Sequence, residues 1–268
     1  MCEAVAMLSA YPLDRWQCVT CDHVGLSATS DRIFCPQCGQ VFPVVDGIMD
    51  CLVTVPTPPL TPAQAIAQSP LFAWGYERLW RPWALSILSG EAFPPYREAQ
   101  VLQELVGDAE LVIDLATGCG YWSRMLLAQD AQRWVVGLDQ SLAVLQEAQR
   151  QRQPHWTRYS LVRAAVERIP LAPQSVDAVI SGASLNELPL VATLQEVSRV
   201  LKPGGVFVTM HSRQGEGLAQ SVQQALGATG LQFYSEMDLR RHGDPVHLQL
   251  QRYLTYGAVA FAQMMKVA

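Results

Sequence analysis

The sequence has few positive charges and no long apolar run. Its 268 residues include 19 lysines and arginines against 24 acidic residues, and only two of these cations are lysines, Lys202 and Lys266. The net charge of −5 and the lack of a basic run argue against a nucleic-acid partner. No segment reaches the roughly 18 consecutive apolar residues that a membrane span requires. The N-terminus also lacks the basic and apolar regions of a secretory signal, so we expect a cytoplasmic protein.

The composition predicts one large domain with a small appendage. Half of the residues are apolar, which is enough for a sizeable core. Most of the negative charge lies in residues 1–51, and residues 52–70 form a proline-rich stretch without charge, typical of a semi-rigid linker. We therefore expect a module at 1–51, a linker at 52–70 and the main domain at 71–268.

Two C-x2-C pairs in the first segment predict a metal site. Cys18 and Cys21 form the first pair and Cys35 and Cys38 the second, with 13 residues between them. Four thiolates at this spacing suit tetrahedral zinc. A bound metal would also stabilise a segment of this size, which cannot bury enough apolar surface to fold alone. We expect a structural zinc ribbon. Two disulfides and a redox dithiol are the alternatives.

Residues Leu111–Gly120 carry the most informative motif of the chain. An apolar strand pattern ends in Gly118 and Gly120, and a helix pattern follows at once. A second apolar run, at 134–138, ends in Asp139, 19 residues after Gly120. This order is typical of a nucleoside-binding crossover in which the acid binds the ribose. Ser123 occupies the third position of G-x-G-x-x-G, so the pattern favours a nucleoside without phosphates over a dinucleotide.

The remaining pattern alternates strands and helices, which predicts a parallel sheet covered on both faces. The expected helices cover 97–106, 189–201 and 217–226, and Ser235 is expected to cap another that runs through Arg241. The expected strands cover 158–163, 176–181, 206–210, 231–233 and 253–265. The aromatic segment 71–88 is interpreted as a packing helix or, alternatively, as a lid over an apolar substrate that Pro82 could kink.

Four motifs in order resemble those of class I S-adenosylmethionine-dependent methyltransferases. They are Val112–Gly120, Val136–Asp139, Ile169–Val179 and Val200–Gly205. The chain is most similar to the ubiquinone/menaquinone C-methyltransferase branch, and among its members to plastid and cyanobacterial-type enzymes with a cysteine ribbon in front. The segments Phe42–Ile48 and Tyr76–Arg81 carry that closer likeness.

The resemblance implies a Rossmann-like, mostly parallel α/β sheet of seven strands whose last strand is antiparallel. It also implies that S-adenosylmethionine is the cofactor, with zinc as a structural metal. By position, the expected cofactor-binding residues are Asp114, Ala116, Gly118, Gly120, Asp139, Gln140, Val166 and Ser181. Gly182 and Leu185 would border the acceptor pocket. Ala116 and Ala165 depart from the glycine and the aspartate that relatives often carry.

The sequence names no catalytic base, because methyl transfer needs mainly alignment of donor and acceptor and exclusion of water. Tyr76, Asn186, Glu187 and His211 are weak candidates, and we expect His211 to be a surface or hydrogen-bonded residue. The leading hypothesis is methyl transfer to a small apolar or aromatic acceptor. The alternatives are a ribosomal RNA guanine-N1-type base methyltransferase and an interaction module that binds the cofactor without catalysis. The oligomeric state is left open.

Overall fold

The computed structural model describes residues 13–29, 32–52, 81–215 and 218–268. The predicted linker at 52–70, apart from Leu52, lies outside these ranges, and so does the part of the predicted aromatic segment at 71–80, which includes Tyr76. No helix in the described ranges is long and apolar enough to cross a membrane.

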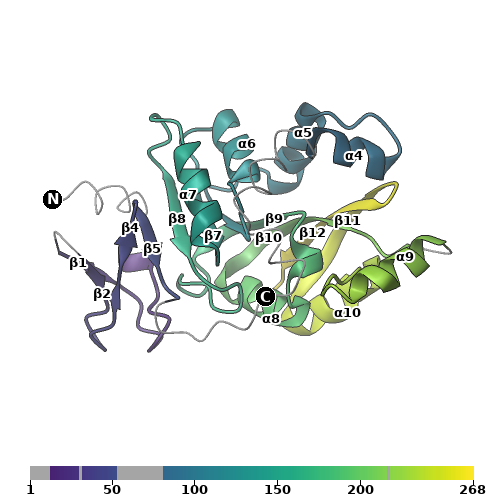
Figure 1. Ribbon diagram of the computed structural model, residues 1–268. Helices are drawn as coiled ribbons and strands as arrows, with labels where there is room; N and C mark the ends of the chain where they lie inside the picture. The colour runs from purple at the N-terminus through teal and green to yellow at the C-terminus, as the bar shows by residue number, and fades with distance from the viewer. Residues whose placement is uncertain (1–12, 30–31, 53–80, 216–217) are drawn as a thin grey trace.

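One nine-stranded sheet forms the centre of the molecule (Figure 1). Its strand order is β11-β12-β10-β9-β6-β7-β8-β5-β4, and β6 to β10 are parallel. The strands are β6 Leu111–Leu115, β7 Trp134–Asp139, β8 Tyr159–Arg163, β9 Val176–Gly182, β10 Leu201–Ser212, β11 Leu248–Tyr256 and β12 Val259–Lys266. These seven match the predicted sheet, and β12 is the predicted antiparallel last strand. The N-terminal segment adds β4 Val44–Val45 and β5 Ile48–Asp50 to the β8 edge.

Two strand predictions near the C-terminus are wrong. The single strand predicted at 253–265 is a hairpin of β11 and β12 that turns at Gly257, where the backbone has φ 53°. The strand predicted at 231–233 is not formed; next to it only Tyr234 makes an isolated bridge, to Arg213. Apolar content alone does not reveal a two-residue turn, because the residues on both sides of it are equally suited to strands.

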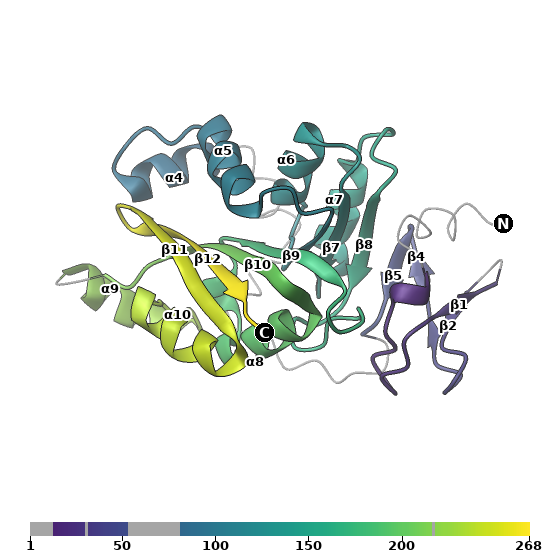
Figure 2. The ribbon, with the colours of Figure 1, turned by 180° about the vertical axis from the view of Figure 1, so that it is seen from behind.

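Helices cover both faces of the sheet (Figures 1 and 2). On one face lie α4 Arg81–Ser89, α5 Pro95–Val106, α6 Tyr121–Gln129 and α7 Leu142–Arg150; on the other lie α8 Leu190–Val200, α9 Leu218–Gly227 and α10 Glu236–Gly243. Short 3-10 turns occur at Leu13–Arg15, Leu185–Glu187 (η3) and Asp244–Val246. Ser235 caps α10 as predicted: it accepts a hydrogen bond from the Asp238 backbone, and the Asp238 side chain accepts one from Ser235.

The N-terminal module packs directly on this sheet. Its own small antiparallel sheet consists of β1 Ser27–Ala28, β2 Ile33–Phe34 and β3 Val41–Phe42. The buried side chains of Trp16, Phe42 and Met49 belong to the same hydrophobic cluster as Val162 and Leu171 of the main domain. Trp16 also forms an isolated β-bridge with Leu171. One continuous core therefore joins the module to the domain.

The described part of the aromatic segment is partly exposed. Within α4, Leu85 is buried in a cluster with Phe93, whereas Trp83 and Ile87 are 69% and 68% exposed. A packing role therefore holds for Leu85, and the lid alternative depends on residues outside the described ranges.

Candidate functional site

A tight loop between β6 and α6 forms the base of the predicted cofactor site. The Asp114 carboxylate is 1% exposed and accepts hydrogen bonds from Thr117 Oγ1 (2.6 Å), Ser123 Oγ (2.7 Å) and the Ser123 backbone N–H (3.0 Å). The Thr117 N–H donates in turn to the Leu138 carbonyl at 2.9 Å. The Asp114 carboxylate therefore fixes the conformation of the loop through these hydrogen bonds.

Two glycines of this loop have distinct roles. Gly120 has φ 78°, and a Cβ at this position would lie 2.4 Å from the Tyr159 hydroxyl, so a larger residue does not fit. Gly118 has φ 55°, and a Cβ there would meet no atom of the described residues within 4 Å, so none of them fills the space beside its backbone. Ala116 adopts φ 54°, a left-handed conformation that costs an alanine about 1 kcal/mol. At Gly118 the loop therefore offers bare backbone that a ligand could approach closely.

Asp139 meets this loop at the carboxyl end of β7. Its Oδ2 accepts a hydrogen bond from the Gly118 N–H at 3.0 Å, and its Oδ1 accepts one from the Ser141 N–H at 2.9 Å. Burial raises the pKa of Asp139 to about 6, helped by the nearby charge of Asp114 and opposed by these two hydrogen bonds. The carboxylate and the glycine loop that the sequence placed in one site are therefore in contact.

This pKa predicts that cofactor binding depends on pH. If Asp139 binds the ribose as expected, its carboxylate form would accept both hydroxyls, so affinity for S-adenosylhomocysteine should be constant above pH 7 and fall as the pH drops through about 6. Glu187, whose pKa is raised to about 7 by burial and by the charge of Asp139, titrates in the same range. Calorimetry of wild type and Glu187→Gln between pH 5 and 8 measures this. The loss of affinity at low pH should persist in Glu187→Gln, and an affinity independent of pH in wild type contradicts the assignment.

The other predicted cofactor residues lie along the same edge. Gln140 follows Asp139 directly, and the Ala164 N–H donates to the Asp139 carbonyl at 3.0 Å, which brings the loop with Val166 alongside. Ser181, fully buried in β9, lies one residue beyond Ile180, the register partner of Asp114. These placements are compatible with the cofactor roles given to the residues, which stay predictions.

The predicted border of the acceptor pocket lies beside α6. The backbone of Gly182 packs against the Trp122 indole, which a Cβ at Gly182 would approach to 2.8 Å. Trp122 donates in turn to the buried Glu98 carboxylate of α5 at 2.7 Å. Glu98 is a residue that sequence reasoning missed, because nothing in an isolated helix pattern marks one acid as buried.

The weak candidates for a base differ in their surroundings. Asn186 is tied by hydrogen bonds to the backbone of Ser212 and Gln232 and has a structural role. His211 is 1% exposed, so the prediction of a surface residue is wrong, and within the described part of the chain neither ring nitrogen has the hydrogen-bond partner that was expected from the sequence. Burial lowers the pKa of His211 to about 4, which keeps the ring neutral at pH 7.

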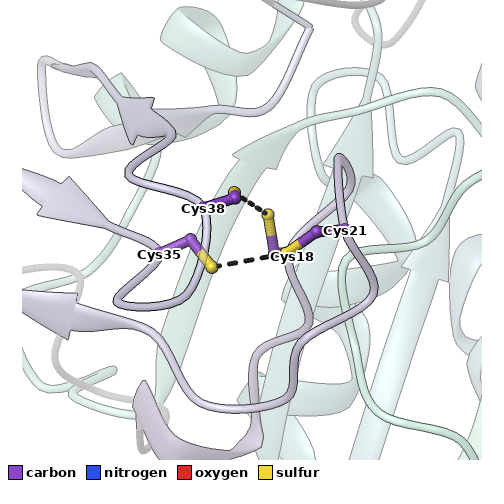
Figure 3. A group of neighbouring side chains, drawn as sticks. All are labelled: Cys18, Cys21, Cys35 and Cys38. Atoms are coloured by element: carbon purple, nitrogen blue, oxygen red, sulfur yellow. Dashed lines mark hydrogen bonds between the residues drawn. The ribbon is translucent and has the colours of Figure 1, made fainter.

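The four cysteines of the N-terminal module converge on one point (Figure 3). Their sulfur atoms all lie within 4.8 Å of one another, with Cys18 and Cys38 at 3.7 Å and Cys21 and Cys35 at 3.6 Å. Ligands about 2.3 Å from a tetrahedral zinc stand roughly 3.8 Å apart, whereas a disulfide needs about 2.05 Å. The geometry fits zinc and not the two disulfides that the sequence left open.

Within this cluster, the pKa of the Cys35 thiol is lowered from its ordinary value. Burial disfavours the Cys35 thiolate, but hydrogen bonds from the backbone N–H groups of Cys38 and Gln37 and from the neighbouring thiols together lower the pKa of Cys35 to about 7. Since zinc binds thiolates, such a group lowers the cost of metal binding at neutral pH.

Sequence reasoning also missed a connection between the module and the cofactor site. Asp50, the last residue of β5, forms an ion pair of 2.8 Å with Arg163 at the end of β8. The two residues are far apart in sequence, and no local pattern pairs them.

Comparison with known proteins agrees with this geometry. Residues 112–205 match the methyltransferase domain family. An uncharacterized chloroplastic methyltransferase of Arabidopsis thaliana is 32% identical over 187 residues, covering 65% of this chain and 52% of its own length. The ubiquinone/menaquinone biosynthesis C-methyltransferase of Syntrophotalea carbinolica is 35% identical over 120 residues, 44% of this chain and 51% of its own. The chain thus spans about half the length of these relatives.

Solved structures share the fold at lower identity. Geranyl diphosphate C-methyltransferase from Streptomyces coelicolor superposes with a TM-score of 0.61 at 15% identity, over 79% of this chain and 100% of that one. A complex of the Haloferax volcanii Trm112 methyltransferase activator with a methyltransferase matches with a TM-score of 0.59 at 19% identity, over 76% of this chain and 97% of the matched one. The strand order, the glycine loop and the match over residues 112–205 together indicate a methyltransferase domain with the class I fold in this part of the chain.

Proposed function

We propose that this protein transfers a methyl group from S-adenosylmethionine to a small apolar or aromatic acceptor. The contact between the Gly118 backbone and the Asp139 carboxylate carries the proposal. The glycine loop and this carboxylate lie together at the carboxyl edge of a parallel sheet, where such folds bind nucleosides, and this supports a ribose-binding role for Asp139. A quinone-type acceptor fits the proposal best, because curated relatives include ubiquinone/menaquinone C-methyltransferases.

The residues along this edge would contact different parts of the cofactor and the acceptor. Asp139 would accept hydrogen bonds from the ribose, and Gln140 and Val166 would flank the adenine. Ala116, Gly118 and Gly120 would contact the methionine end, with Asp114 beneath them. The cofactor supplies a methyl group already activated by its sulfonium, so the chain has to align the acceptor and exclude water. Ser181 would contact the cofactor, and Gly182 and Leu185 would border the acceptor beside it.

The N-terminal module would bind one structural zinc through Cys18, Cys21, Cys35 and Cys38. Cysteines that bind zinc instead of pairing as disulfides are typical of reducing compartments, which agrees with a cytoplasmic protein or with one in a plastid. The net negative charge of the module disfavours the RNA-methylating alternative, since a phosphate backbone would be repelled.

Two measurements test the proposal. Calorimetry with S-adenosylhomocysteine should show binding of micromolar strength, and no binding would refute it. Mass spectrometry should then compare metabolites of cells with and without the gene. The proposal expects one small molecule to lose about 14 Da when the gene is removed. Methylation of ribosomal RNA instead would support the RNA alternative, and no change in any methylated species would favour a non-catalytic binding module.

A further inference from the structure

Arg163 stands between the N-terminal module and the cofactor site. It is the last residue of β8 and is the register partner of Asp50 on β5 and of Asp139 on β7. The three residues therefore lie side by side across the sheet, with Arg163 in the middle. Their strands end at the edge that carries the glycine loop.

The Arg163 side chain forms hydrogen bonds both to the N-terminal module and to the turn after Asp139. Its Nη1 donates to Asp50 Oδ2 at 2.8 Å, and its Nε donates to the Gln140 carbonyl at 2.9 Å. Asp50 is itself fixed, because its Oδ1 accepts a hydrogen bond from the Leu52 N–H at 2.9 Å. The Arg163 carbonyl accepts one more hydrogen bond from the module, from the Cys51 N–H at 2.8 Å. The guanidinium is thus held by the module on one side and holds the turn after Asp139 on the other.

The turn that Arg163 holds is part of the proposed cofactor site. Asp139 Oδ1 accepts from the Ser141 N–H within it, so the position of the Gln140 peptide affects the orientation of the carboxylate. A charge-assisted hydrogen bond is shorter and stronger than a neutral one, and the planar guanidinium fixes both partners at once.

We propose that Arg163 is a positioning residue that couples docking of the cysteine module to the nucleoside end of the cofactor site. The module then acts as a built-in support for cofactor binding, in addition to adding two strands to the sheet. This inference rests on the proposed function, since it takes the turn at Gln140 to flank the cofactor.

A second ion pair at the same interface provides a matched control. Arg168 and Asp22 form an ion pair of 2.8 Å between the domain and the module, with 41% and 66% of their side chains exposed. Among the described residues, this pair makes no hydrogen bond to Gln140 or Asp139. It contributes to docking alone, and an exposed pair of this kind contributes little to stability.

The test compares Arg163→Gln, Asp50→Asn and Arg168→Gln with wild type in the full-length protein. Calorimetry with S-adenosylhomocysteine should show affinity about 10-fold lower for Arg163→Gln, since two charge-assisted hydrogen bonds are lost. Asp50→Asn should lower it about threefold, because it frees the guanidinium but leaves the bond to Gln140. Arg168→Gln should stay within twofold of wild type.

Hydrogen exchange separates positioning from general loosening. Amides at 139–145 should exchange faster in Arg163→Gln, while those of α8 keep their wild-type rates. Faster exchange throughout the chain, or affinity within twofold of wild type for both Arg163→Gln and Asp50→Asn, would overturn the inference. If wild type itself fails to bind S-adenosylhomocysteine, the proposed function fails, and the inference with it.

Discussion

Replacing Asp139 with asparagine should weaken binding of S-adenosylhomocysteine about 30-fold or more. A carboxylate accepts from both ribose hydroxyls, whereas an amide offers only one acceptor oxygen. The amide NH2 would also face one of the two backbone donors, Gly118 N–H or Ser141 N–H, that now point at the carboxylate. Loss of one charge-assisted hydrogen bond costs about 2 kcal/mol, which corresponds to roughly 30-fold in affinity.

Isothermal titration calorimetry measures this effect directly. Glu167→Gln is a suitable control, because Glu167 is an exposed acid on the loop after β8 and its removal changes the net charge equally. The control should bind as wild type does. A folded Asp139→Asn variant that binds within threefold of wild type would show that this carboxylate does not contact the ribose.

Replacing Cys18 or Cys35 with serine should remove the metal and destabilise the whole chain. Either change leaves three thiolates where a structural zinc needs four ligands, and metal binding supplies much of the folding free energy of such small modules. Zinc measured by mass spectrometry should fall from about one per chain to near zero. Because the module shares its core with the domain, a loss of about 3 kcal/mol would lower the unfolding midpoint by about 10 °C.

Cys51→Ala is the matched control for the cysteine variants. Cys51 is buried in the same module, and it lies outside the cluster of four sulfurs. Burial raises the pKa of its thiol, so it stays protonated and is a poor ligand. This variant should keep its zinc. If Cys18→Ser and Cys35→Ser also keep one zinc per chain, the four-cysteine site is wrong.

The parts of the site that depend on local sequence could be predicted. The strand before Gly118, the helix after Gly120 and the acid at 139 belong to one crossover, in which spacing along the chain dictates distance in space. Likewise, two short C-x2-C pairs limit how their thiols can meet, and the four sulfurs do converge.

The parts of the site that depend on long-range packing could not be predicted from the sequence. The pairing of Asp50 with Arg163 arises only because β5 joins the sheet beside β8, which no pattern within either segment shows. His211 lies near the end of β10, which pairs with β12, and its ring lies beside that of Tyr253 on β11, so its burial depends on residues distant in sequence. The turn at Gly257 was missed because apolar residues continue on both sides of it.

A crystal structure of the protein with S-adenosylhomocysteine tests the central claim most directly. We expect the ribose hydroxyls within about 3 Å of the Asp139 carboxylate and the amino-acid end of the ligand against the backbone of Gly118. A ligand bound elsewhere, or one whose ribose makes no hydrogen bond to Asp139, would contradict the account.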